Sequence, residues 1–361
     1  MELWIGWRSG LVATLGALML LSNGGPATAQ TKSEGERLMS QAIALAERDP
    51  AGALAMMRQA ASTGDAEAIN ALGVFRMQGV GAPADLDEGM RLWEQAASKG
   101  SKGAQVNLGR LYLTDGESGN DAKGYALVAP LLDDPKVRPA VLYPAGRALI
   151  FGLGAPADLA RGMALLVESA PYEENNADAM FLLGRGYQNG WGGLKTDNRL
   201  ATSYFRKSAE LGDQRAQWQY GMALLEGLGT PVNAREAWRW VKASADQGYI
   251  NGMTSAAVML AIGQGVAEDD VQARAWYEKA ARAGSTHAMG SLAMMVMTGE
   301  GGPADDVLGQ AYLELALAAG GERPRAMMSR FGITPTPEQR KRIDRIKADW
   351  KRTAQPLDPD S

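Results

Sequence analysis

Residues 68–100 read AINALGVFRMQGVGAPADLDEGMRLWEQAASKG. Small and apolar residues recur in this stretch at helical spacing, which is typical of an amphipathic helix that buries one face. The stretch is interrupted once, at Gly79-Val80-Gly81-Ala82-Pro83, where glycine can end one helix and Asp85 can cap the next. After this turn, Leu92-Trp93 is followed by Ala96-Ala97, which places large and small side chains on one second helix. The stretch therefore predicts two helices joined by a glycine-rich turn.

The Leu72-Gly73 pair of this stretch returns at a fixed period along the chain. The second members of the successive pairs stand 36, 37, 38, 37, 36 and 36 residues apart. The equivalent pairs are Leu108-Gly109, Ala145-Gly146, Leu183-Gly184, Tyr220-Gly221, Ala256-Ala257 and Leu292-Ala293. Because an isolated helix pair has nothing to bury its apolar face against, repeated pairs must stack on one another. We therefore expect an all-α, right-handed helical-repeat solenoid of about seven helix pairs.

The repeated stretches resemble the Sel1-like repeat, a relative of the tetratricopeptide repeat with a longer loop between its helices. The resemblance rests on residues 68–100 and on AVMLAIGQGVAEDDVQARAWYEKAARAGS, which begins at Ala257. It extends from Ala66 to about Gly320 and is specific in five of the seven units. It implies a solenoid that acts through protein–protein contacts and has no enzymatic activity. Exported relatives include regulators that hold sensor kinases in check and scaffolds for polysaccharide export or envelope assembly.

Two units depart from the pattern. The unit that begins at Gly103 has an irregular turn at residues 115–119 and no aromatic pair in its second helix. The unit that begins at Ala140 carries Pro144 inside its first helix, where a proline removes a backbone hydrogen bond. We expect this first helix to be bent or shortened.

The beginning of the chain has the pattern of a secretory signal peptide. Arg8 lies in a short basic segment, Leu11 to Leu21 is apolar, and Ala27-Thr28-Ala29 is a small-residue cleavage site. The apolar run is too short for the roughly 20 residues that cross a bilayer. We expect residues 1–29 to be removed and the mature protein to be periplasmic or secreted, without stable membrane insertion.

The remaining segments are assigned by their place around the repeats. Residues 30–65 are expected to form N-terminal helices with a partial repeat, and residues 66–322 the Sel1-like solenoid. Residues 323–353 are expected to form capping helices and residues 354–361 a tail. In the last helix, Thr336 and Gln339 make a capping box around Pro337. Its basic face is expected to be solvated, and to contact other groups only secondarily.

The composition excludes several kinds of chemistry. The chain has no cysteine and one histidine, His287, so zinc fingers, iron–sulfur clusters and multi-histidine metal centres are excluded. A net charge of -4 does not provide the basic surface of a nucleic-acid binder. The Gly-x-Gly motifs stand between helices and never after a predicted strand, so they are turns and not nucleotide-binding loops. We expect no cofactor, no metal, no catalytic residues and no nucleic-acid partner.

Candidate partner-binding residues emerge when the first helices are aligned on the Leu-Gly pair. In related helical repeats, the residue two before the Leu and the residue after the Gly look into the concave groove. Three successive units carry arginine at the later position, and three overlapping units carry aromatic residues at the earlier one. The candidates in this groove are Arg110, Arg147, Arg185, Tyr143, Phe181, Trp218 and Met222. Arginine and aromatic residues are enriched where binding energy is concentrated.

Three functional interpretations remain open. The first is that the groove of an exported scaffold or regulator binds an extended acidic segment of another envelope or periplasmic protein. The second is that Tyr143, Phe181 and Trp218 stack on a polysaccharide or peptidoglycan strand. The third, a hydrolase of envelope polymers, has no paired carboxylates in the sequence to support it. Against all three, the arginines can pair internally with residues such as Glu168, Glu173 or Asp178, and the aromatic rings can belong to the core.

Overall fold

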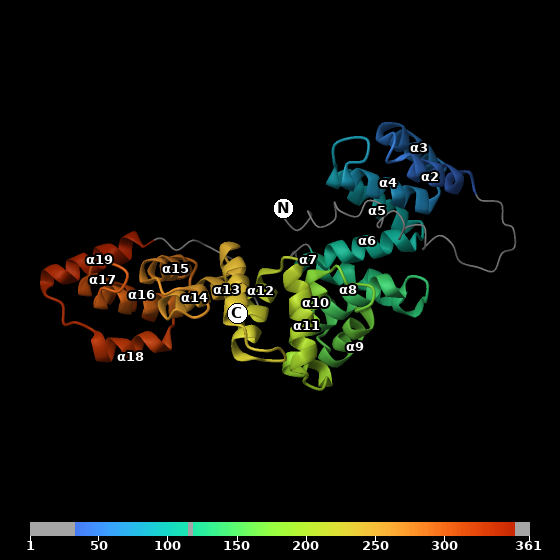
Figure 1. The fold of residues 1–361 in the computed structure, drawn as a ribbon. Coiled ribbons are helices and arrows are strands. Elements are labelled where there is room, and N and C mark those ends of the chain that lie inside the picture. The colour runs from blue at the N-terminus through green and yellow to red at the C-terminus, as the bar shows by residue number, and fades with distance from the viewer. Residues whose placement is uncertain (1–32, 115–117, 351–361) are drawn as a thin grey trace. The chain divides into compact units, whose positions relative to one another are not determined.

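The computed structural model describes residues 33–114 and 118–350, and every regular element in these ranges is helical (Figure 1). The predicted signal peptide, the tail and part of the irregular turn at 115–119 lie outside these ranges. Among the described residues, no helix combines the length and the apolar character needed to cross a lipid bilayer. The all-α prediction is confirmed.

The helices fall into two compact units, each with its own core. The first comprises the described residues up to Glu173 together with Trp191–Gly193, and the second comprises 174–190 and 194–350. The first unit contains α2 (Glu34–Leu45), α3 (Pro50–Ser62), α4 (Ala66–Gln78), α5 (Leu86–Ser98), α6 (Lys102–Tyr112), α7 (Ser118–Val128), η2 (Ala129–Asp133), α8 (Arg138–Phe151), α9 (Leu159–Ser169) and η3 (Trp191–Gly193). The second contains α10 (Ala177–Asn189), α11 (Asn198–Glu210), α12 (Gln214–Glu226), α13 (Ala234–Asp246), α14 (Ile250–Ala261), α15 (Asp270–Arg282), α16 (Thr286–Thr298), α17 (Asp306–Ala318), α18 (Glu322–Phe331) and α19 (Pro337–Asp349). Within each unit, consecutive helices pack in antiparallel pairs, as the repeat predicts.

Local sequence explains where the repeat helices begin and end. The carboxylate of Asp197 accepts a hydrogen bond from the backbone N–H of Leu200 and so caps α11. Asp213 caps α12 in the same way. At the other end of α12, Gly227 adopts the left-handed conformation, with φ 73°, that terminates the helix.

The Leu-Gly pair of each first helix allows the second helix to approach closely. Leu183 is fully buried, and a Cβ atom added at Gly184 would lie 2.5 Å from the ring of Phe205 on α11. At the equivalent place in the first unit, Gly73 accommodates the indole of Trp93. In both helix pairs, the glycine of the first helix therefore leaves room for an aromatic ring of the second helix, and this complementarity builds the core of the pair.

The second glycine of each turn has a role between repeats that the sequence analysis did not assign. A Cβ atom at Gly229 would lie less than 3.0 Å from the backbone carbonyl of Asn198, at the start of α11 in the preceding repeat. Gly265 stands in the same relation to Ala234 at the start of α13. The Gly-x-Gly turn thus packs on the backbone of the preceding second helix.

The repeat that contains Pro144 keeps a full first helix. α8 spans 14 residues with Pro144 inside it, while the first helices of the preceding and following repeats, α6 and α10, span 11 and 13 residues. The expected shortening is therefore wrong, because the buried packing of Val141, Leu142 and Ala145 holds the helix together on both sides of the proline, while the expected bend stays a prediction. His287 is exposed in the first turn of α16, as expected.

The C-terminal helix α19 packs on α17, and Ile343 is its fully buried residue. The predicted capping box between Thr336 and Gln339 is present, with Pro337 at the first helical position. On the basic face of α19, Lys341, Arg342 and Arg345 are exposed, in line with the expectation of a solvated face, while two other basic side chains reach α17. Arg340 and Lys347 both bond the carboxylate of Glu314 on α17, at 2.8 Å each.

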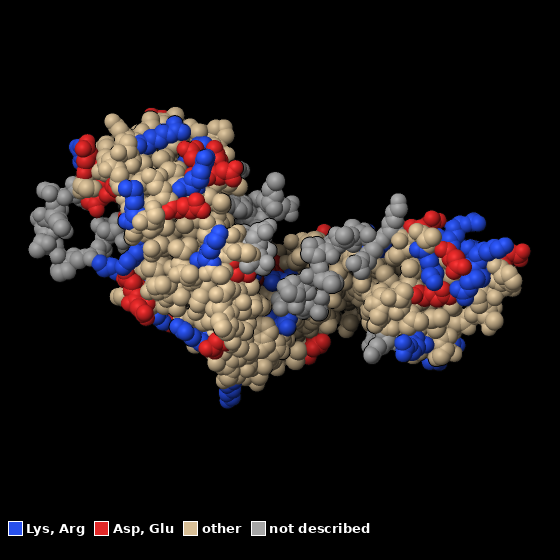
Figure 2. Space-filling model, turned by 180° about the vertical axis from the view of Figure 1, so that it is seen from behind, with Lys and Arg blue, Asp and Glu red and all other residues tan. Residues whose placement is uncertain are grey.

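Charged side chains of both signs are interspersed over the face that Figure 2 shows. The described residues of this face form no extended area of positive charge of the kind that binds nucleic acid. Acidic and basic side chains also lie next to each other at the C-terminal end, at the right of the view.

Candidate functional site

The seven predicted site residues lie on the first helices α6, α8, α10 and α12, at two positions one helical turn apart. We call the earlier position inner and the later position outer. The inner residues are Asn70, Val106, Tyr143, Phe181, Trp218, Thr254 and Gly290. The outer residues are Val74, Arg110, Arg147, Arg185, Met222, Val258 and Met294.

Inner residues contact the first helix of the following repeat. Asn107 donates a hydrogen bond from Nδ2 to Oδ1 of Asn70, at 3.0 Å. The indole N–H of Trp218 donates to Oγ of Ser255 on α14, at 2.9 Å. The inner position therefore joins neighbouring repeats, and most of its side chains have little surface left for a ligand.

Two of the three aromatic candidates are buried. Tyr143 is 5% exposed and Phe181 is 1% exposed, so their rings belong to the core. The ring of Phe181 lies 6.0 Å from that of Phe205 and 4.1 Å from the guanidinium carbon of Arg215. Only Trp218 keeps part of its ring accessible, with Tyr249 packed 6.0 Å from it. Open stacking on Tyr143 and Phe181 is not available in this structure.

The three candidate arginines are partly exposed and make contacts within their own units. Arg110 forms an ion pair with Glu173 at 3.3 Å and bonds the carbonyl of Ala140. Arg147 donates to the carbonyl oxygen of Leu113, at the end of α6, at 2.6 Å. Arg185 places its guanidinium 6.0 Å from the ring of Phe181, one turn earlier on α10. Arg110 and Arg147 lie in the first unit, and Arg185 lies in the second.

The internal-partner interpretation is correct for Arg110, which pairs with Glu173. Of the other two acids proposed as partners, Glu168 pairs with Arg138 and Asp178 pairs with Arg215. Arg110 and Arg147 therefore help to hold repeats together. Their part in partner binding stays a prediction.

Arg215 is the central cation of an ion-pair cluster that the sequence analysis missed. Its guanidinium bonds Asp178 and Asp213, each at 2.7 Å, and covers the ring of Phe181. Burial by itself would lower the pKa of Arg215, but the hydrogen bonds and charges of the two aspartates raise the pKa above the ordinary arginine value. Asp178 and Arg215 stand 37 residues apart, at equivalent places in successive repeats, and that spacing was the signal available in the sequence.

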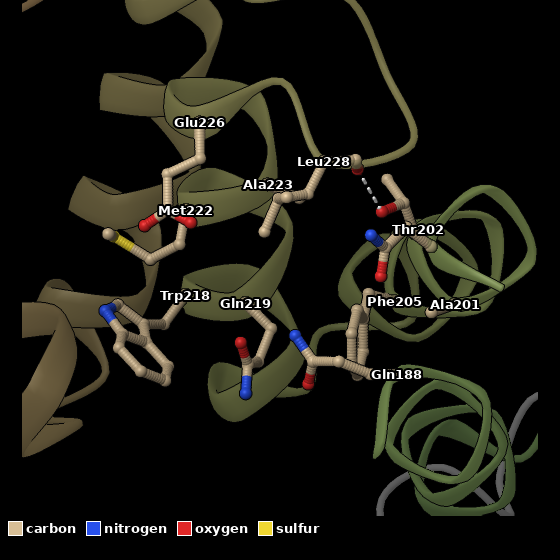
Figure 3. Close-up of a pocket in the computed structure, with 11 residues that line it drawn as sticks. Gln188, Ala201, Thr202, Phe205, Trp218, Gln219, Met222, Ala223, Glu226 and Leu228 are labelled. Carbon is tan, nitrogen blue, oxygen red and sulfur yellow. Dashed lines mark hydrogen bonds between the residues drawn. The ribbon is translucent and has the colours of Figure 1, made fainter. Parts of the chain in front are cut away.

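A cavity of about 150 Å³ opens in the second unit where α10, α11 and α12 meet (Figure 3). Trp218 and Met222, both predicted site residues, line it from α12. Phe205 and Leu228 form much of its apolar wall, and Thr202 fixes the loop by donating to the carbonyl oxygen of Leu228 at 2.7 Å. Cavities of about this volume can hold a molecule the size of benzene.

Polar side chains surround this apolar base. Figure 3 shows the amide groups of Gln188 on α10 and Gln219 on α12 directed into the same space, while Glu226 stands beside Met222. A primary amide can donate and accept hydrogen bonds, so such a pair can match the N–H and C=O groups of a peptide backbone. The arrangement can hold an apolar side chain and hydrogen-bond the chain on either side of it.

The alignment of the repeats did not single out the two glutamines. Gln188 lies one turn beyond Arg185 on α10, and Gln219 directly follows Trp218. The helical spacing of Gln188 from Arg185 was a usable signal. The place of Gln219 depends on how α11 and α12 pack, which spacing alone does not reveal.

Comparison with protein-family profiles matches the Sel1 repeat at residues 66–101, 177–213, 214–249, 251–285 and 286–321. The chain belongs to the Sel1 repeat family. The five matched stretches are those in which the sequence resemblance is specific, and the two irregular units, which fold as α6–α7 and α8–α9, are not matched. Sel1 repeats mediate protein–protein interactions, and their fold is typically non-enzymatic.

Solved structures of Sel1 repeat proteins share this fold. A protective antigen of uropathogenic Escherichia coli, described as having an SLR fold, is 20% identical, with a TM-score of 0.62 over 95% of this chain and 84% of that chain. A Sel1 repeat protein from Oxalobacter formigenes is 23% identical, with a TM-score of 0.53 over 64% of this chain and 96% of that chain. At these identities the likeness shows the fold and not a shared partner.

An uncharacterized protein of Neisseria meningitidis serogroup B is 27% identical over 213 residues, which is 56% of this chain. The chain spans 40% of the length of that relative.

Proposed function

We propose that this Sel1 repeat protein is an exported scaffold or regulator that binds a segment of another envelope or periplasmic protein. The observation that carries the proposal is the cavity beside Trp218 and Met222, which combines an apolar base with two convergent amides. The pattern of residues 1–29 supports export. The typical absence of enzymatic activity in this fold supports a binding role.

In this proposal, an apolar side chain of the partner enters the cavity and contacts Trp218 and Met222. The amides of Gln188 and Gln219 hydrogen-bond the partner backbone beside that anchor. Arg185 lies one turn before Gln188 on α10, so an acidic residue near the anchor can pair with its guanidinium. The partner segment is therefore extended, with an apolar anchor and a nearby carboxylate.

A capture experiment on intact envelopes tests the proposal. Wild-type protein, Trp218→Ala and Met222→Glu are crosslinked to their partners, which are identified by mass spectrometry. Because a buried aromatic anchor is worth about 2 kcal/mol or more, Trp218→Ala is expected to weaken partner affinity by roughly thirtyfold. Met222→Glu places a charge in the apolar base and is expected to abolish capture.

Val232→Glu is the matched control, because Val232 is 66% exposed and does not line the cavity. Capture by this variant should equal that of the wild type. An identical set of partners from wild type and Met222→Glu would contradict the proposal. Arg110→Glu and Arg147→Glu are less informative, since both side chains bond the protein's own backbone.

The alternative is binding of a polysaccharide or peptidoglycan strand on the first helices. It depends on Tyr143, Phe181 and Trp218 as a row of stacking surfaces, and the first two rings are buried. The position of these rings therefore favours a protein partner over a glycan on this face.

A further inference from the structure

A second set of aromatic residues recurs on the second helices of the second unit. Tyr204, Trp240, Trp276 and Tyr312 lie at intervals of 36 residues on α11, α13, α15 and α17. Each precedes the residue that fills the core of its helix pair, such as Phe205 or Tyr277. Tyr204, Trp240 and Trp276 are partly exposed, so they offer the accessible ring surface that most inner residues lack.

Trp276 differs from the other three because two lysines converge on its ring. Nζ of Lys279, one turn later on α15, lies 4.3 Å from the ring centroid. Nζ of Lys242, from α13, lies 5.3 Å from the same centroid. Two ammonium groups from different helices are thus gathered at one indole, where the ring attracts each of them although they repel each other.

An open cavity of about 350 Å³ lies at this place, lined by Lys242, Asp246, Gln272, Ala275, Trp276 and Lys279. Asp246 bonds Lys242 at 2.5 and 2.7 Å, so the lining carries two ammonium groups against one carboxylate. Lys279 is exposed and forms no ion pair within the part of the chain that the structure describes. The indole N–H of Trp276 likewise donates no hydrogen bond to any described residue.

We propose that this cavity between α13 and α15 binds an acidic sugar, such as a uronic acid unit of a polysaccharide. The apolar face of the sugar ring packs on Trp276, and its carboxylate pairs with the ammonium groups of Lys279 and Lys242. The site is separate from the cavity beside Trp218 and Met222, and it does not depend on the binding of a protein there.

The composition of the site favours an acidic sugar over other anions. A sugar acid carries a flat apolar face and a carboxylate in one rigid unit, so one residue satisfies the indole and both lysines together. An aspartate or glutamate side chain supplies the carboxylate without the flat face, and an inorganic anion lacks any apolar surface. A neutral sugar leaves the excess positive charge of the lining without a partner.

Calorimetric titration of the full chain with a hexamer of galacturonic acid tests the proposal. The fully methyl-esterified hexamer has the same rings with blocked carboxylates, and hexaglutamate has the carboxylates without the rings. We expect the free acid to bind and the ester to bind at least tenfold more weakly. Lys279→Ala should weaken binding of the acid by roughly two- to fivefold, as for an exposed charge pair. Trp276→Ala should abolish measurable binding.

Lys207→Ala is the matched control, because Lys207 stands 5.9 Å from the ring of Tyr204 in the same i, i+3 relation on α11 and lies outside the cavity lining. The affinity of Lys207→Ala for the acid should equal that of the wild type, and the two lysine variants should unfold at the wild-type temperature. Equal binding of acid and ester, no binding of the acid, or equal losses in Lys279→Ala and Lys207→Ala would each overturn the proposal. Tighter binding of hexaglutamate than of the sugar would overturn it in favour of an acidic peptide.

Discussion

Glycine residues in one turn of this protein have unequal roles. Gly227 and Gly229 both adopt positive φ, at 73° and 70°. Only Gly229 lies so close to the backbone of the preceding repeat that an added Cβ would collide with the carbonyl of Asn198. The motif therefore combines a helix stop at its first glycine with an inter-repeat contact at its second.

Alanine substitutions separate these two roles. Gly227→Ala is expected to cost about 1–2 kcal/mol of unfolding free energy, because a side chain disfavours left-handed backbone. Gly229→Ala adds a steric clash between repeats and is expected to cost a further ~1–3 kcal/mol. Urea denaturation followed by circular dichroism measures both values. Equal losses in the two variants would show that the close approach of Gly229 to Asn198 does not matter.

The two aromatic residues at successive inner positions should also behave differently. Phe181 is 1% exposed, so Phe181→Ala is expected to destabilise the protein by about 3–5 kcal/mol through the cavity it leaves. Trp218 is partly exposed, and its substitution by alanine should reduce partner affinity more than it reduces stability. Thermal unfolding of the two variants, compared with their partner capture, distinguishes the roles. A greater loss of stability in Trp218→Ala would assign Trp218 to the core.

At the scale of single elements, α19 depends on carboxylates for its place on α17. Burial tends to raise the pKa of Glu314, but the hydrogen bonds from Lys347 and Arg340 outweigh burial and lower the pKa below its usual value. Burial likewise tends to raise the pKa of Asp305, but the hydrogen bonds from the backbone N–H of Leu308 and from Arg342 outweigh burial and lower the pKa below its usual value. A lowered pKa means that the folded state favours the charged form.

The docking of α19 should therefore weaken in acid. The stabilisation by Glu314 is fully present above its ordinary pKa of 4.5 and is lost as the pH falls through the lowered folded-state value. Wild type should melt at a higher temperature than Glu314→Gln at pH 7, and the difference should shrink between pH 5 and pH 3. Calorimetric melting across this range provides the test. A difference that is constant with pH would show that the charge of Glu314 does not hold α19.

The elements were predictable because their signals are local. The Asp197 cap, the Gly227 stop and the Thr336 capping box each depend on a few neighbouring residues. The length of α8 was misjudged because the effect of Pro144 depends on tertiary packing around the helix, which outweighs the local cost. The ion pairs of Arg340 and Lys347 with Glu314 also escaped prediction, since they join residues 26 and 33 positions apart.

At the scale of the molecule, the repeat period was sufficient to predict the helix pairs but not the surface they leave open. Trp218 and Met222, which the alignment selected, line a cavity, while Phe181 at the same inner position as Trp218 is core. This difference arises because the neighbours of each inner residue vary from repeat to repeat: Arg215 covers Phe181, whereas Ser255 bonds only the edge of Trp218. Binding surfaces in a repeat protein therefore depend on the departures from the repeat.

The most direct test of the central claim is hydrogen exchange of the protein with and without its captured partner, read by mass spectrometry. Binding at the cavity predicts slower exchange in the last turn of α10, around Gln188, and along α12, with α15 and α19 unchanged. Protection confined to α15 or α19, with α10 and α12 exchanging as in the free protein, would contradict the account.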